Sequence, residues 1–120
     1  MTRQISLPNQ VTVANDKPFV LIAGPCQMES RDHAMMMAEQ LSKVTSKLKI
    51  PLIFKTSFDK ANRTSAKAAR GMGIQKAIPV FEEIRKTFGC PILTDVHDTE
   101  QCAMIGDAAD ILQIPAFLCR

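Results

Sequence analysis

Four short apolar runs, separated by segments with helical periodicity, constrain the fold of this 120-residue chain more than any other feature. The runs cover residues 19–23, 52–54, 91–94 and 111–114. They are too apolar for strands with one solvated face, which is typical of a parallel sheet covered by helices. The order of the segments therefore predicts an α/β fold of the βαβαβαβ type.

Three helices are expected between these runs. Ser30 is a suitable N-cap for the first helix. The second follows Gly71 and ends at Gly89, and Pro79 within it predicts a kink or a split, because an interior proline costs about 3 kcal/mol. Asp98 and Gln101 form a capping-box pattern before a short third helix. The apolar stripe of the first helix is expected to consist of Ala34, Met37, Leu41, Val44 and Leu48.

The amino-terminal residues 4–14 alternate between apolar and polar types on either side of Pro8-Asn9, which predicts a short hairpin. The 120 residues suffice for one domain, which we expect to span 1–120.

Polar or otherwise distinctive residues follow each predicted strand at its carboxyl end. In parallel α/β folds, and above all in (β/α)₈ barrels, this end of the sheet carries the chemistry. The convergence therefore predicts an active site there. The residues are Cys26, Lys55, Asp95 with His97, and Gln113 with Phe117.

The segment 54–69 concentrates positive charge behind the second strand and contains Asp59 as its one acid. Amide and hydroxyl side chains alternate with the cations, and both kinds of group bind phosphate oxygens. The segment suits a phosphorylated small molecule; the alternative is a solvated basic surface. Its cations are Lys55, Lys60, Arg63 and Lys67, and its hydrogen-bonding residues include Asn62, Thr64 and Ser65.

Composition excludes several other classes of protein. The net charge is +3, and the six Phe with no Trp or Tyr do not suggest a nucleic-acid groove. No segment resembles a signal peptide or reaches the length of a membrane span, so no membrane partner and a cytoplasmic location are expected. The four cysteines are widely spaced, which favours reduced thiols over a disulfide scaffold.

Four segments together resemble the 3-deoxy-D-manno-octulosonate 8-phosphate synthase family, also called 2-dehydro-3-deoxyphosphooctonate aldolases. They are LIAGPCQMES at 21–30, FKTSFDKANRTS at 54–65, PILTDVHD at 91–98 and DILQIPAFLCR at 110–120. The sequence Lys-Ala-Asn-Arg at 60–63 best distinguishes this family from the related 3-deoxy-D-arabino-heptulosonate 7-phosphate synthases, which have a sequence similar to Lys-Pro-Arg-Thr at this place. The resemblance implies a (β/α)₈ barrel, of which this chain supplies the hairpin and about the first four βα units.

The resemblance also implies the reaction and the residues that serve it. The family condenses phosphoenolpyruvate with arabinose 5-phosphate and water, in lipopolysaccharide sugar biosynthesis. Lys60, Asn62 and Asp95 match catalytic positions. Positions that match the family's contacts with phosphoenolpyruvate are Lys55, Lys60, Gln113 and Ala116, with Phe117 beside them. Those that match its contacts with arabinose 5-phosphate are Asn62, Arg63, Thr64, Ser65 and Asp95. Arg120 matches a basic, substrate-binding position in the loop after the fourth strand.

Cys26 in Gly24-Pro25-Cys26 resembles the metal-dependent class of the family, whose other class has asparagine here. A lone cysteine beside a strand is more often a buried apolar residue. The resemblance instead implies a ligand for a divalent ion, namely zinc, iron(II) or manganese. The family's other ligands, a histidine, a glutamate and an aspartate, belong to the second half of the barrel. His97 does not match any of them and is expected to be a structural residue or one at the edge of the site.

Four βα units are half of a barrel, which usually needs about 250 residues. We therefore expect either that the rest of the barrel is missing from this sequence or that another copy completes it. The isolated chain is expected to be inactive, and the resemblance implies a homotetramer for the intact enzyme. The alternatives are a heptulosonate synthase and a half-barrel that binds sugar phosphates without catalysis.

Overall fold

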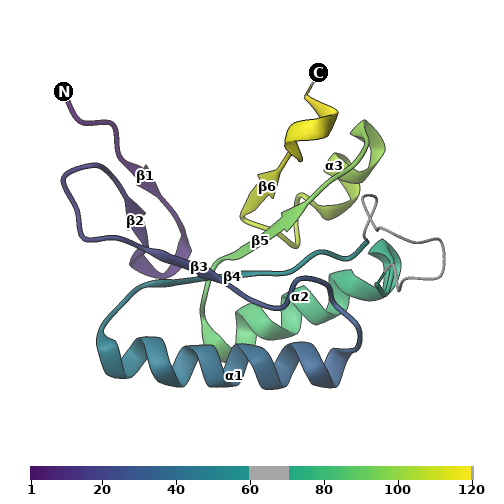
Figure 1. Cartoon of the computed structure of the whole chain (residues 1–120), viewed down its shortest axis with the longest axis horizontal. Coiled ribbons are helices and arrows are strands. Elements are labelled where there is room, and N and C mark those ends of the chain that lie inside the picture. The colour runs from purple at the N-terminus through teal and green to yellow at the C-terminus, as the bar shows by residue number, and fades with distance from the viewer. Residues whose placement is uncertain (60–70, 120) are drawn as a thin grey trace.

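The computed structural model describes residues 1–59 and 71–119 (Figure 1). The predictions for Lys60, Asn62, Arg63, Thr64, Ser65, Lys67 and Arg120 lie outside these residues. The strands are β1 (Ile5–Ser6), β2 (Thr12–Val13), β3 (Leu21–Ala23), β4 (Leu52–Lys55), β5 (Ile92–Asp95) and β6 (Ile111–Gln113). The α-helices are α1 (Arg31–Leu48), α2 (Ile74–Phe88) and α3 (Thr99–Ile105), and short 3-10 turns cover η1 (Pro8–Gln10) and η2 (Ala116–Leu118).

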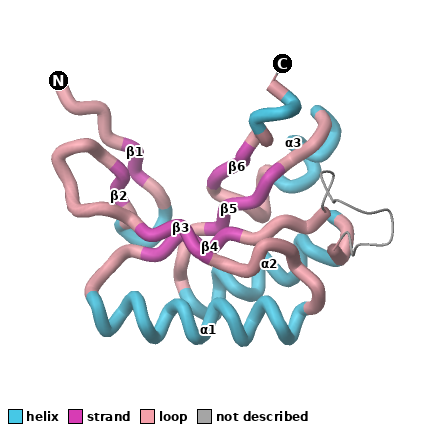
Figure 2. Tube along the Cα trace, in the orientation of Figure 1, coloured by secondary structure: helices cyan, strands magenta, loops and turns pink. Residues whose placement is uncertain are grey.

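The main sheet is parallel, and its strands lie in chain order, β3-β4-β5-β6 (Figure 2). Its register pairs Ile22 with Ile53, Lys55 with Leu93, and Asp95 with Gln113. Doubly wound folds reverse their strand order at a switch point, whereas the strands of a barrel follow one another without reversal. The observed order agrees with part of a barrel, and the expected α/β class with a parallel sheet is confirmed.

One face of the sheet is covered by helices. Figure 1 shows α1 and α2 side by side beneath β3 and β4, and α3 contacts α2. Between sheet and helices lies the main core, in which Phe54, Phe81, Ile84 and Ile92 are fully buried. These large side chains come from alternate strand positions and from one side of α2, which explains why the sequence forms these elements.

The opposite face of the sheet has a second, smaller core, which contains the alternate residues of the strands. Ile53 and Leu93 are buried there against Val11, with Leu7 and Ile111 at the edge. Val11 and Leu7 flank η1 in the β1–β2 hairpin, so the predicted hairpin exists and covers the amino-terminal end of this face. Beyond it, towards the carboxyl ends of the strands, this face carries polar residues.

Side-chain caps define the helix boundaries that the sequence predicted. Ser30 Oγ accepts a hydrogen bond of 3.1 Å from the backbone N–H of His33. Asp98 caps α3 by accepting from the N–H of Gln101 at 2.9 Å. Gly89 ends α2 in the left-handed conformation, with φ of 70°. Of the kink or split expected at Pro79, the split does not occur, since α2 continues through this residue.

The expectation that every strand of the main sheet is buried on both faces is wrong for the two outer strands. Ile22 in β3 is 49% exposed, and Ile114, just after β6, is 62% exposed. Within the described residues neither strand has a neighbour on its outer edge. Burial is therefore complete only in β5 and nearly so in β4, at the centre of the sheet.

The predicted stripe of α1 is also partly wrong. Val44 and Leu48 are 54% and 60% exposed, and the buried positions are Ala34, Ala38 and Thr45. These buried side chains are small, and the hydroxyl of Thr45 donates to the carbonyl of Leu41 within the same helix at 2.8 Å. The prediction from helical periodicity gave most weight to large apolar side chains, so it chose the face of α1 next to the one that is buried.

Candidate active site

Three of the predicted site residues share the face of the sheet that no described helix covers. Side chains alternate along a strand, so Lys55 lies on the same face as Ile53, and Asp95 on the same face as Leu93. Gln113 is the register partner of Asp95 on β6. All three stand at or next to the carboxyl end of their strand. The structure thus brings a cation, a carboxylate and an amide to one edge of one face.

Asp95 is the most buried of these polar groups, with 6% of the residue exposed. Its Oδ2 lies 2.9 Å from Nε2 of His97, two residues later in the chain. The other oxygen, Oδ1, is buried and has no hydrogen-bond partner among the described residues. A buried carboxylate oxygen without a partner is costly unless a ligand or water satisfies it, so Asp95 is prepared to accept a hydrogen bond.

Lys55 is half-buried at the end of β4, and its ammonium has no ion-pair partner in the part of the chain that the structure describes. Its backbone is fixed by Gly24. A Cβ on Gly24 would lie 1.8 Å from the carbonyl oxygen of Lys55, so only glycine permits this approach of the two strand ends. The Gly24-Pro25-Cys26 motif therefore has a packing role beside its predicted chemical one.

Backbone hydrogen bonds join the loops at this end of the sheet. The N–H of Met28 donates to the carbonyl of Ser57 at 2.8 Å, and the N–H of Met72 donates to the carbonyl of Met28 at 3.1 Å. The N–H of Gly73 donates to the carbonyl of Phe58 at 2.9 Å. Met28 and Phe58 are fully buried. The loops after β3 and β4 are thus held to each other and to the main core at the carboxyl end of the sheet.

Cys26 is exposed and follows β3 at the same end of the sheet. No group of three or more His, Cys, Asp or Glu residues suited to a metal ion occurs within 1–59 and 71–119. A thiolate is a suitable donor for zinc or iron(II), so Cys26 fits the role of one ligand. The described residues do not supply a complete ligand set with it.

The remaining predicted contacts, Ala116 and Phe117, lie in η2 and are exposed. Beside them, Ile114 and Leu118 line a cavity of about 240 Å³ together with His97 and Cys102. The cavity thus lies between the residues that follow β6 and His97, the partner of Asp95. The contact between Asp95 and His97 was not predicted. The sequence feature that could have indicated it is Asp-Val-His at the end of a strand, which places two titratable side chains two residues apart.

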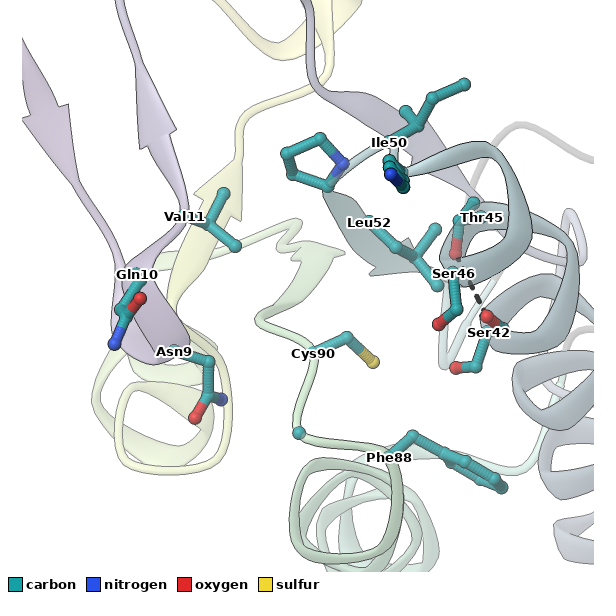
Figure 3. A pocket seen from close by; sticks show the side chains of 13 residues that line it. Asn9, Gln10, Val11, Ser42, Thr45, Ser46, Ile50, Leu52, Phe88 and Cys90 are labelled. Atoms are coloured by element: carbon teal, nitrogen blue, oxygen red, sulfur yellow. Dashed lines mark hydrogen bonds between the residues drawn. The ribbon is translucent and has the colours of Figure 1, made fainter.

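A larger cavity of about 410 Å³ lies at the opposite, amino-terminal end of the strands (Figure 3). Hydroxyl side chains of α1, including Thr45 and Ser46, face Asn9 of the hairpin and Cys90 across it. Burial raises the pKa of the Cys90 thiol, which keeps it protonated and weakly reactive. Parallel α/β folds carry their chemistry at the carboxyl ends of the strands, so the polar residues there, rather than this larger cavity, form the candidate active site.

The chain has a parallel α/β sheet with its strands in chain order and polar residues at their carboxyl ends. Comparison of its sequence with known proteins identifies the family. A family model described as the DAHP synthetase I family matches residues 2–120. The chain belongs to this family.

Individual relatives are more specific. A 2-dehydro-3-deoxyphosphooctonate aldolase of Rickettsia felis is 59% identical over 112 residues, which are 93% of this chain and 41% of that protein. The enzyme of the same name from Brucella ovis is 60% identical over 110 residues, 92% of this chain and 40% of that protein. The chain therefore spans about two fifths of the length of these relatives. Their shared name favours the octulosonate over the heptulosonate branch of the resemblance.

Proposed function

We propose that the longer protein to which this chain corresponds condenses phosphoenolpyruvate with arabinose 5-phosphate and water, which yields 3-deoxy-D-manno-octulosonate 8-phosphate and inorganic phosphate. The observation that carries the proposal is the convergence of Lys55, Asp95 and Gln113 on one uncovered face at the carboxyl end of the sheet. It is supported by the name of relatives that are 58–60% identical.

Lys55 supplies fixed positive charge for an anionic substrate. Phosphoenolpyruvate carries a carboxylate and a phosphate, and arabinose 5-phosphate carries a second phosphate, so the two substrates repel each other. An ammonium group at a partly buried strand end, without an ion-pair partner in residues 1–59 and 71–119, would lower this repulsion and orient the anion. The resemblance extends this cationic set to Lys60 and Arg63, and to Arg120 near the end of the sequence.

Asp95 and Gln113 suit hydroxyl groups rather than phosphates. The free Oδ1 of Asp95 accepts a hydrogen bond, and the Gln113 amide both donates and accepts. A carboxylate next to a phosphate would be repelled, whereas a sugar hydroxyl gains a charge-assisted hydrogen bond from it. Asn62, Thr64 and Ser65 would add further contacts to arabinose 5-phosphate, and Ala116 and Phe117 would form an apolar wall of the pocket.

Cys26 would be one ligand of a divalent ion, with the others supplied by residues outside this sequence. When bound, such an ion supplies Lewis-acid stabilisation of developing negative charge. The exposed position of Cys26 at the carboxyl end of β3 supports this assignment. The identity of the ion, among zinc, iron(II) and manganese, is decided by the complete ligand set.

The intact protein would form a closed (β/α)₈ barrel, whose further strands pair with the outer edges of β3 and β6. The exposed Ile22 on β3 supports this, because barrel closure would bury it. The resemblance further suggests a homotetramer.

The substrate assignment is tested by phosphate release from phosphoenolpyruvate with two alternative aldoses. We expect rapid release with arabinose 5-phosphate and little with erythrose 4-phosphate, followed by identification of the eight-carbon product by mass spectrometry. Asp95→Asn should lower turnover, since a neutral amide forms weaker hydrogen bonds than a carboxylate. Preference for erythrose 4-phosphate would instead assign the protein to the heptulosonate synthases.

The metal assignment has a separate test. Treatment of the longer protein with a strong chelator should abolish activity, and a divalent ion should restore it. Cys26→Ser should weaken metal retention, as measured by elemental analysis after dialysis, because a hydroxyl is a poorer ligand than a thiolate. Full turnover after verified metal removal would disprove the assignment.

A further inference from the structure

We propose that His97 is a positioning residue for Asp95: it holds one carboxylate oxygen so that the other faces the substrate in a fixed direction. The inference rests on the proposed function, in which Asp95 contacts the sugar. It assigns a role to His97, which was not part of the predicted phosphate-binding segment or of the predicted metal site.

The geometry of the pair supports this division between the two oxygens. Oδ2 of Asp95 lies 2.9 Å from Nε2 of His97, whereas Oδ1 has no partner in the described part of the chain. Both side chains are almost completely buried, with 8% and 11% of their surface exposed. An ionised carboxylate only accepts hydrogen bonds, so Nε2 must carry the proton that joins the pair.

His97 is itself held at two points, once through its backbone and once through its ring, whose Nδ1 is buried without a hydrogen-bond partner among the described residues. The backbone N–H of His97 donates to Oε1 of Gln101 at 2.8 Å, and Gln101 belongs to the first turn of α3. The edge of the ring meets Phe58, with 6.0 Å between centroids and 63° between planes. Phe58 follows β4 and is fully buried in the main core. The histidine thus connects Asp95 to two rigid elements.

Such a connection is needed because the terminal torsion of an aspartate is soft. The χ2 angle of Asp has broad minima, so an unsupported carboxylate would sample many orientations. A charge-assisted hydrogen bond to one oxygen fixes the plane of the group and therefore the direction in which Oδ1 accepts. His97 would thereby act on the substrate through Asp95 rather than by direct contact.

The test is a double-mutant cycle in the longer protein, with phosphate release as the assay. His97→Leu should reduce kcat/KM for arabinose 5-phosphate about tenfold or more, the effect of losing a hydrogen bond to a charged group. His97→Gln, whose amide can reach a similar position, should restore a large part of this loss. In an Asp95→Asn background, His97→Leu should cost little more. His33→Leu, in α1, is the matched control and should leave the rate unchanged.

A second readout does not depend on activity. In protein labelled with ¹⁵N-histidine, the resonances lost in His97→Gln identify this ring, and they should report protonation at Nε2. Asp95→Asn should shift them. An unshifted His97 signal, or an equal cost of His97→Leu with and without Asp95, would overturn the proposal. Absence of synthase activity in the unaltered protein would instead refute the proposed function and leave the spectroscopic test intact.

Discussion

Gly24 determines where Lys55 stands, because the two backbones touch at the ends of β3 and β4. An added Cβ would lie 1.8 Å from the carbonyl oxygen of Lys55 and 2.7 Å from its carbonyl carbon. Neither atom can move without breaking the parallel pairing of the strands. The requirement for glycine at this position is steric rather than conformational.

Gly24→Ala should therefore destabilise the protein by about 1–3 kcal/mol or more, the usual cost of overpacking. The measurement is urea denaturation of the longer protein, followed by circular dichroism. Gly106→Ala is the control: Gly106 has helical backbone angles, and its nearest contact to an added Cβ is 3.0 Å away. Equal stability of Gly24→Ala and the unaltered protein would show that the two strand ends are further apart than described.

Single residues at the carboxyl end were predictable to different degrees. Asp95 and Lys55 stand out in the sequence because each is a charged residue that directly follows an apolar run. The partner of Asp95 was not predictable, because the geometry that turns His97 back towards it depends on the Gln101 contact and on Phe58. Which side chains pair across a loop depends on tertiary packing, and the spacing of apolar residues in the sequence carries no information about it.

At the scale of elements, the buried face of α1 consists of small residues. Ala38 is fully buried in α1 and belongs to the core, whereas Val44 is 54% exposed. A guanidinium–carboxylate interaction between Arg31 and Glu83 joins the same two helices at their surface. The order and type of the elements were predictable from the apolar runs and caps. The buried face of α1 was not, because alanines give a weak hydrophobic signal.

Two substitutions distinguish the observed face of α1 from the one that periodicity predicts. Ala38→Leu should destabilise the protein by about 1–3 kcal/mol, since Ala38 is fully buried in the main core and a larger side chain would overpack it. Val44→Ala should cost less than Ala38→Leu if Val44 stays exposed in the longer protein. Thermal denaturation of both variants is the measurement. The reverse order of the two effects would mean that α1 is rotated relative to this description.

At the scale of the whole molecule, the sheet presents two outer edges and an uncovered apolar surface. Phe19 and Ile22 are exposed at the β3 edge, and Leu112 and Ile114 are exposed at the β6 edge. Such edges and surfaces are normally covered, because they promote association. No helix within 1–59 or 71–119 is long and apolar enough to cross a membrane. These surfaces are therefore consistent with a sheet that further strands would complete.

We propose that these 120 residues form one half of a barrel whose site requires the rest. The most direct measurement compares the isolated chain with the longer protein by light scattering and by the synthase assay. We predict dimers or larger species without activity for the isolated chain, and activity with arabinose 5-phosphate for the longer protein. An isolated chain that is a monodisperse monomer, unfolds sharply and has synthase activity would contradict the account.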